Sequence, residues 1–176
     1  LNQTDQFGSD LRDVKFDGAE MTKAILTRAN LSNSSLKSVG LSKAEGSRTV
    51  LKNSDFTDSD FTKAEMFRSD FSGSVMKNVN MSKSEFSRAN FEGTDLSGAN
   101  ITFANIARAQ LAGAKLDGTD FSSSWMYLAK LVGTDLSAAK GLTQDQLNLA
   151  CGDDTTVLPA GLTTPESWPC IDEDQE

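Results

Sequence analysis

The sequence contains no histidine, so it lacks the side chain that most often serves as a general base or a metal ligand. It has only two cysteines, three prolines and 7% aromatic residues. No apolar run approaches the length of about eighteen residues that a membrane span needs. Neither a cluster of metal ligands nor a nucleophile beside a base can be recognised. These absences argue against an enzyme, a metal or cofactor site and a membrane span.

Basic residues are missing from the end of the chain. Residues 1–140 carry 17 acidic and 17 basic residues, whereas residues 141–176 carry 8 acids and no base. The net charge of −8 therefore belongs entirely to the C-terminal segment. General nucleic-acid binding needs clustered Lys and Arg, so a body without net charge predicts no nucleic-acid partner.

Large apolar residues recur with a period of five. Of the 26 positions taken every fifth residue from Leu11 to Leu136, 25 are Leu, Ile, Phe or Met, and only Gly46 is not. The residue two places before each is Ala, Ser, Thr or Val. This period fits neither an α-helix nor a simple strand. If the chain turns after every five residues, each small and large pair points inward, and the other three positions face solvent.

A second period, of twenty residues, gives the number of sides. Charged residues recur at this spacing in three sets: Lys23, Lys43, Lys63 and Lys83; Glu45, Glu65 and Glu85; Arg28, Arg48, Arg68, Arg88 and Arg108. Four pentapeptides in each repeat predict a four-sided coil in which residues twenty apart stack on one another. At the usual spacing between strands, the rod would be roughly 30 Å long.

The stretch RANFEGTDLSGAN, which begins at Arg88, resembles the pentapeptide repeat family, whose motif is roughly Ala-Asp/Asn-Leu-x-x. The resemblance covers residues 11–140. It implies an all-β solenoid, namely a right-handed quadrilateral parallel β-helix with the small and the central apolar residues inside. The sequence departs from the motif where Asp or Asn is expected, at Ile25, Val50, Val75 and Trp125.

Three segments follow from this pattern. We expect residues 1–10 to be an N-terminal cap or lead-in, residues 11–140 to be the β-helix, and residues 141–176 to be a C-terminal cap with an acidic tail. Both ends of such a rod are open sheet edges that need covers. The C-terminal cover should contain a short helix with Thr143 as N-cap and Gln146 as its capping-box partner, ending at Gly152.

The only cysteines, Cys151 and Cys170, both lie in this C-terminal cap. A disulfide between them would close a loop of about 20 residues and contribute roughly 3 kcal/mol. A segment with so little core needs a covalent link, which favours the disulfide over two free thiols. With the disulfide, a periplasmic, lumenal or secreted location is favoured, and otherwise a cytoplasmic one. Because the chain begins at Leu1 rather than Met, an upstream segment may be absent from it.

Two groups of residues are candidates for an interaction surface. One is the arginine ladder of Arg28, Arg48, Arg68, Arg88 and Arg108, and the other is the set of outward aromatic residues Phe67, Phe103, Trp125 and Tyr127. The charged ladders can instead be solvated surface whose charges compensate one another. The aromatic patch is either covered by the C-terminal segment or exposed to a partner. We expect residues 141–170 to fold over the last coil and over part of this patch.

Gly46 interrupts one apolar column, where we expect either a void or a neighbouring side chain that has shifted inward. The function that fits the sequence best is a non-enzymatic structural or protein-interaction module with an unknown protein partner. The family resemblance implies an alternative, since some members mimic double-stranded DNA and bind type II topoisomerases. Such mimicry needs a long acidic rod, and this rod is short and has no net charge. We expect a monomer, because dimeric relatives join through C-terminal elements and these acidic ends would repel one another.

Overall fold

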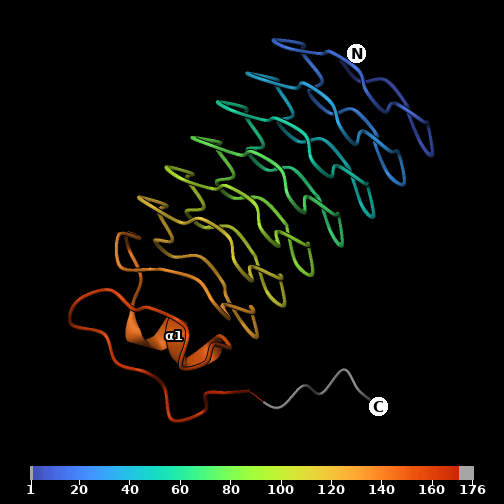
Figure 1. Ribbon diagram of the computed structural model, residues 1–176. Helices are drawn as coiled ribbons and strands as arrows, with labels where there is room; N and C mark the ends of the chain where they lie inside the picture. The colour runs from blue at the N-terminus through green and yellow to red at the C-terminus, as the bar shows by residue number, and fades with distance from the viewer. Residues whose placement is uncertain (1, 171–176) are drawn as a thin grey trace, which may run out of the picture.

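The computed structural model describes residues 2–170. The chain winds as a stack of similar coils, with the N-terminus at one end and helix α1 (Gln144–Leu149) at the other (Figure 1). Parallel bridges join residues that are twenty apart throughout the stack, from Asp5 with Ile25 to Asp120 with Lys140. Each coil forms four such bridges, one on each side. The chain is therefore a four-sided parallel β-solenoid, as the twenty-residue period predicts.

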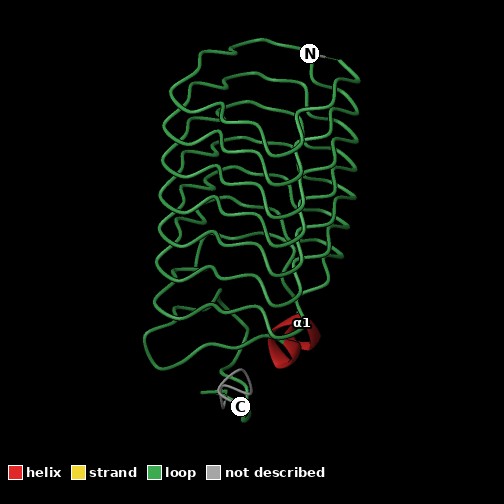
Figure 2. Ribbon diagram, turned by 90° about the vertical axis from the view of Figure 1, so that its right-hand side faces the viewer, coloured by secondary structure: helices red, strands yellow, loops and turns green. Residues whose placement is uncertain are grey.

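The sides of this solenoid are single bridging residues joined by tight turns. Within residues 2–170 no bridging residue is followed by another, and the stacked turns carry no extended strand (Figure 2). Each side uses the same three backbone bonds. Leu51 N–H donates to Asp70 in the next coil at 2.7 Å, Asn53 N–H donates to Ser72 at 3.1 Å, and Asp55 N–H donates back to Ser34 at 3.0 Å. The hydrogen bonds therefore run along the rod axis and make each coil depend on its neighbours.

The interior is filled by four columns of central apolar residues. From Met21 to Leu136 every apolar member of these columns is at most 1% exposed. Phenylalanines meet in the middle of the rod, where the rings of Phe71 and Phe91 stack with centroids 5.3 Å apart. Phe56 and Phe61 approach the Phe71 ring edge-on at 5.8 and 5.9 Å. Such aromatic contacts add to the free energy gained by burying the rings.

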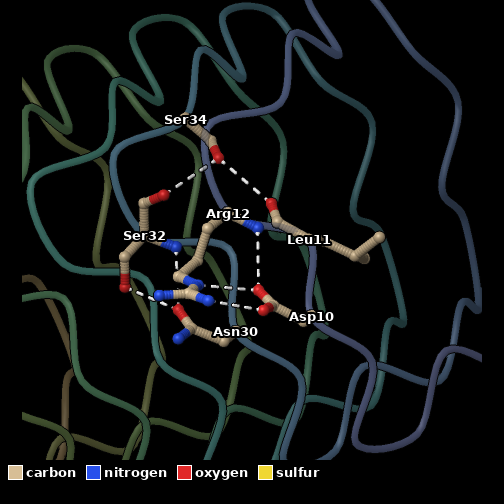
Figure 3. A network of polar contacts seen from close by, with 6 residues as sticks. All are labelled: Asp10, Leu11, Arg12, Asn30, Ser32 and Ser34. Atoms are coloured by element: carbon tan, nitrogen blue, oxygen red, sulfur yellow. Dashed lines mark hydrogen bonds and ion pairs between the residues drawn. The ribbon is translucent and has the colours of Figure 1, made fainter.

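The small inward positions accept Ser and Thr because their hydroxyl groups bond to the previous coil. Ser54 donates to the carbonyl oxygen of Leu31 at 2.8 Å, and Thr94 donates to that of Phe71 at 2.9 Å. Ser34 makes the equivalent bond to Leu11 at 3.3 Å (Figure 3). No buried side-chain nitrogen or oxygen within the described residues lacks a hydrogen-bond partner. The core therefore holds polar groups without the cost of leaving them unpaired.

The position before each central residue shapes the turn that follows. Where it is Asp or Asn, its side-chain oxygen accepts the backbone N–H two residues later, as Asp60 does from Thr62 at 2.9 Å and Asn80 from Ser82 at 3.1 Å. This local bond explains why the repeat prefers Asp and Asn at this position. The second residue after each central residue has a positive φ at every corner from Gln3 to Gly133.

Gly46 leaves no void in its column. The Sδ atom of Met66, one coil further along, occupies the place that a Cβ of Gly46 would take, and its Cε lies 3.0 Å from that place. Of the two outcomes expected from the sequence, the inward shift of a neighbour is the one that occurs. A flexible, unbranched Met side chain suits such an irregular gap.

Residues 2–10 already follow the coil. Asp5 and Asp10 bridge to Ile25 and Asn30, so this segment forms half of the first coil and has no separate structure. The guanidinium group of Arg12 donates to Asp10 at 2.8 and 2.7 Å and holds the pKa of that carboxyl below its usual range (Figure 3).

The segment after Lys140 lies over the last coil (Figure 1). Thr143 caps α1 and forms a capping box with Gln146, as expected from the sequence. Leu147 is completely buried, and the Gln146 side chain donates to the carbonyl oxygens of Phe121 and Ser124 at 2.9 and 3.0 Å. The helix therefore seals one side of the open coil with both an apolar and a polar contact.

The expected helix end at Gly152 is wrong, because α1 ends at Leu149 with Ala150 as an extended C-cap. Gly152 has a different role. The Trp168 indole occupies the space where a Cβ of Gly152 would stand, and its Nε1 donates to Ala150 at 2.7 Å. The favoured disulfide between Cys151 and Cys170 forms, with their Cα atoms 5.4 Å apart. It holds the Trp168 segment against the end of the rod.

Candidate functional site

Stacking by twenty gathers most of the candidate residues on one side of the rod, formed by residues 24–28 and their equivalents in the other coils. The arginine ladder lies along the corner of this side. The N–H groups of Arg48 and Arg108 donate to Phe67 and Tyr127 at 2.9 and 2.8 Å, which places these aromatic residues in the adjacent column. We refer to this side as the basic–aromatic face; it consists of Phe7, Arg28, Arg48, Phe67, Arg68, Arg88, Arg108, Trp125 and Tyr127.

The aromatic column of this face has a regular spacing. Phe7, Phe67 and Tyr127 stand sixty residues apart, which is three coils or about 14 Å along the rod. Thr, Ser or Ala occupies the intervening coils. Phe7 was not recognised from the sequence because the repeats were taken to begin at Leu11. The sixty-residue spacing from Phe67 is the signal that could have found it.

Two of these aromatic side chains lie beside arginines. The Cζ atom of Arg68 lies 5.0 Å from the ring centroid of Phe67, and that of Arg28 lies 5.8 Å from the ring centroid of Phe7. Both distances are within the range of cation–π attraction. These contacts hold the guanidinium groups close to the face instead of leaving them free in solvent.

The C-terminal end of the face carries the most exposed aromatic residues. The Trp125 and Tyr127 rings are nearly parallel with centroids 6.3 Å apart, and 51% and 42% of these residues are exposed. Phe103 is 63% exposed and lies on the adjoining corner, where it continues the column of Lys23, Lys43, Lys63 and Lys83. Together these three side chains form an exposed apolar patch.

The structure corrects the expectation that the C-terminal segment covers part of this patch. Leu158, Leu162 and Trp168 pack against the core at the end of the rod, and the side that carries Trp125 and Tyr127 remains exposed. The segment therefore contacts the last coil and leaves about half of Trp125 and Tyr127 exposed.

Among the described residues, direct ion pairs do not link the charged ladders on this side of the rod. Within residues 2–170, no ion pair joins the Lys23–Lys83 ladder or Arg28, Arg48, Arg68 and Arg88 to a carboxylate. Glu85 instead accepts from Ser87 N–H at 2.9 Å and from the Asn105 side chain at 2.8 Å. Four arginines thus keep their charge available to a ligand.

Two of the other three sides carry ion pairs within the rod. Lys37 pairs with Asp55 at 3.2 Å and Lys77 with Asp95 at 3.3 Å on one side, and Lys52 pairs with Asp70 at 3.0 Å on the side before it. Burial raises the pKa of Asp95, but the hydrogen bonds from Ser97 and the Lys77 ammonium group together lower that pKa below its usual range. These sides therefore present paired charges, which leave little for a charged partner to gain.

A shallow groove on the basic–aromatic face is lined by Arg68, Arg88, Arg108 and Gln110. Guanidinium and amide groups are hydrogen-bond donors, and three guanidinium groups on successive coils suit an anion. Gln110 was not anticipated, because no residue of its type recurs at the twenty-residue spacing. Among the described residues, no group of three or more His, Cys, Asp and Glu could hold a metal ion, and no helix is long and apolar enough to cross a membrane.

Comparison with known proteins gives a consistent result. Residues 47–121 match the family model for a pentapeptide repeat region, and residues 7–44 and 104–140 match the model for pentapeptide repeats (8 copies). No curated protein matches the chain in sequence.

Among solved structures, a trypsin-treated form of QnrB1, a plasmid-mediated fluoroquinolone resistance protein, is 13% identical, with 88% of each chain covered and a TM-score of 0.58. HetL, a pentapeptide repeat protein involved in heterocyst differentiation regulation in the cyanobacterium Nostoc, is 17% identical, with 92% of this chain and 86% of that chain covered and a TM-score of 0.41. At this identity the likeness to QnrB1 shows the fold alone.

Proposed function

Because the chain belongs to the pentapeptide repeat family, we propose that it is a non-enzymatic protein-interaction module that binds its partner through the basic–aromatic face. One observation carries this proposal. Exposed Trp125 and Tyr127 stand on the same side of the rod as Arg68 and Arg88, for which no ion pair occurs within the described residues. Trp, Tyr and Arg are the residues that contribute most often to the energy of protein interfaces.

The side chains favour this function over the DNA-mimic alternative. A mimic of double-stranded DNA must present rows of negative charge to its target. Here the exposed ladder at the corner is made of arginines, and the carboxylates of Asp55 and Asp95 are engaged by lysines. A topoisomerase surface that binds DNA would be repelled by the basic–aromatic face.

Three finer features of the protein belong to the same proposal. The coil is right-handed, as in the family that the sequence resembles. Helix α1 and the segment after it act as a cap, supported by the buried Leu147 and by the disulfide between Cys151 and Cys170. The disulfide also supports an oxidising compartment, either periplasmic, lumenal or extracellular.

Site-specific photocrosslinking tests the binding face. Ser87 and Ser97 lie in the same coil, on opposite sides of the rod, and both are half-buried. A photoreactive amino acid at position 87 is expected to capture a defined protein from an extract of the source organism, whereas the same amino acid at position 97 is not. Equal capture from both positions, or capture from position 97 alone, would contradict the proposed face.

A further inference from the structure

We propose that the groove of Arg68, Arg88 and Arg108 binds an extended acidic segment of the partner protein, with the partner's carboxylates among the guanidinium groups. This inference rests on the proposed function and names the chemistry of the partner. The fourth lining residue, Gln110, adds an amide donor at the same site. The aromatic rings of Phe67 and Tyr127 flank the groove and receive apolar side chains of the same segment.

The donor geometry suits carboxylates. A guanidinium group offers a planar fork that matches the two oxygens of a carboxylate, and such charge-assisted pairs are the stronger hydrogen bonds of proteins. The three arginines stand on successive coils, about 4.8 Å apart along the rod. Arg88, in the middle, has no side-chain partner among the described residues. The binding of an anion there replaces no internal contact.

The corner that carries the arginines has a left-handed backbone, as the other corners have. Arg68 and Arg88 have φ values of 57° and 58°, a conformation that is unfavourable for a long side chain. The next corner along the chain carries glycine at the equivalent positions 73 and 93, with φ values of 69° and 64°. The fold therefore accepts glycine at such corners, and stability alone does not account for arginines at the ladder.

The surroundings of the groove favour a single peptide chain over nucleic acid. Glu45, Glu65 and Glu85 form a column between the arginine and lysine ladders, so the positive strip is narrow. A duplex, which carries phosphates on both strands, would meet this acidic column. A single strand binds by stacking successive bases on aromatic rings. The rings of Phe67 and Tyr127 are three coils apart, too far for consecutive bases but suitable for two apolar side chains of an extended peptide.

Peptide binding by engineered variants of the intact protein tests this inference. The probe is a fluorescein-labelled peptide of about twelve residues, made of Glu and Ser with two Phe, which is long enough to span the groove when extended. Its binding is followed by fluorescence anisotropy at low and moderate salt. The double variant Arg68→Gln/Arg88→Gln is compared with Lys52→Gln/Lys77→Gln, which removes the same charge from other sides of the rod.

We expect Arg68→Gln/Arg88→Gln to weaken binding of the probe by more than about tenfold, because hydrogen bonds to charged groups contribute more to affinity than neutral ones. The lysine variant should change the affinity by less than about twofold, since exposed ion pairs contribute little. Equal weakening by both variants would show a general charge effect and overturn the inference. Tighter binding of a single-stranded oligonucleotide of similar length, or displacement of the probe by millimolar inorganic phosphate, would also overturn it.

The two proposals can fail separately. If photocrosslinking from position 87 captures a partner whose contact segment is not acidic, the function as an interaction module stands and the acidic-segment inference falls. If the probe binds the groove but crosslinking captures nothing from position 87, the anion-binding groove is real and the protein-interaction function is contradicted.

Discussion

The two ends of the solenoid differ in how their open coils are completed. At the N-terminal end, the backbone N–H groups of Asp10, Lys15 and Glu20 find no backbone acceptor among the described residues. Leu11 and Phe16, the central residues nearest this end, are only partly buried. At the C-terminal end the chain itself continues the bridges, since Lys130 pairs with Cys151 and Asp135 with Val157.

Within the described residues, the two ends therefore differ in how well their central side chains are buried. Leu11 and Phe16 stay partly exposed in the first coil. Phe121, Leu131 and Leu136 in the last coils are completely buried. The segment after Lys140 thus supplies, at its end of the rod, contacts that a further coil would otherwise supply.

The largest loss of stability is expected when the C-terminal segment is removed. Truncation after Lys140 would expose Leu131 and Leu136 and remove the disulfide between Cys151 and Cys170. We expect a loss of more than about 4 kcal/mol, because the disulfide alone contributes about 2–4 kcal/mol. The truncated protein should bind a hydrophobic dye and aggregate. A truncated protein that is as soluble and dye-silent as the full chain would show the cover to be dispensable.

Removing a phenylalanine ring should cost more stability in the middle of the rod than in its first coil. Phe91 is 1% exposed and stacks on Phe71, so Phe91→Ala should cost about 3–5 kcal/mol. Phe16 lies in the first coil and is partly buried, so Phe16→Ala should cost only about 1 kcal/mol. Chemical denaturation of the two variants measures both values. A cost below about 1 kcal/mol at Phe91, or equal costs, would contradict the one-dimensional account of the core.

The repeat itself could be predicted from the sequence because each of its positions has one physical role. The period of five fixed which residues face inward, and the period of twenty placed the arginines of the ladder in one column. The start of the repeat was harder to predict. Residues 2–10 follow the coil through backbone hydrogen bonds, without the regular large apolar residues that mark the later repeats. The exposure of Trp125 could not be predicted either, because it depends on where an irregular segment with three prolines passes.

The variant Gly46→Leu tests how tightly the interior of the rod is packed. A void at Gly46 would have accepted a larger side chain, but Met66 already occupies the space. We therefore expect Gly46→Leu to lower the free energy of unfolding by about 1–3 kcal/mol through overpacking. The double variant Gly46→Leu/Met66→Ala should be more stable than Met66→Ala alone, because the leucine then fills the vacated volume. A higher melting temperature for Gly46→Leu alone would show that Met66 moves away freely.

The smallest effect is expected on the association of two copies of the protein through the N-terminal edges of their rods. Two copies could pair their first coils edge to edge, since unpaired bridge positions are templates for another strand. We nevertheless expect a monomer, because residues 1–20 carry five acids and only two bases, Arg12 and Lys15, so two such edges would repel one another. The other end has its bridges completed by Cys151 and Val157. Sedimentation velocity at moderate salt should therefore give one species with the mass of a single chain.

The variant Asp5→Asn/Asp13→Asn makes this last expectation sharper. Asparagine preserves the local acceptor that Phe7 N–H uses on Asp5 and tolerates the positive φ of Asp13. It removes two negative charges from each edge, so any tendency to pair should rise, with a small shift toward dimer at high protein concentration. If charge repulsion keeps the edges apart, the shift should also appear in the unchanged protein when salt is raised. A stable dimer of the unchanged protein at moderate salt would mean that the open edge is a binding surface and that the two ends differ in function as well as in cover.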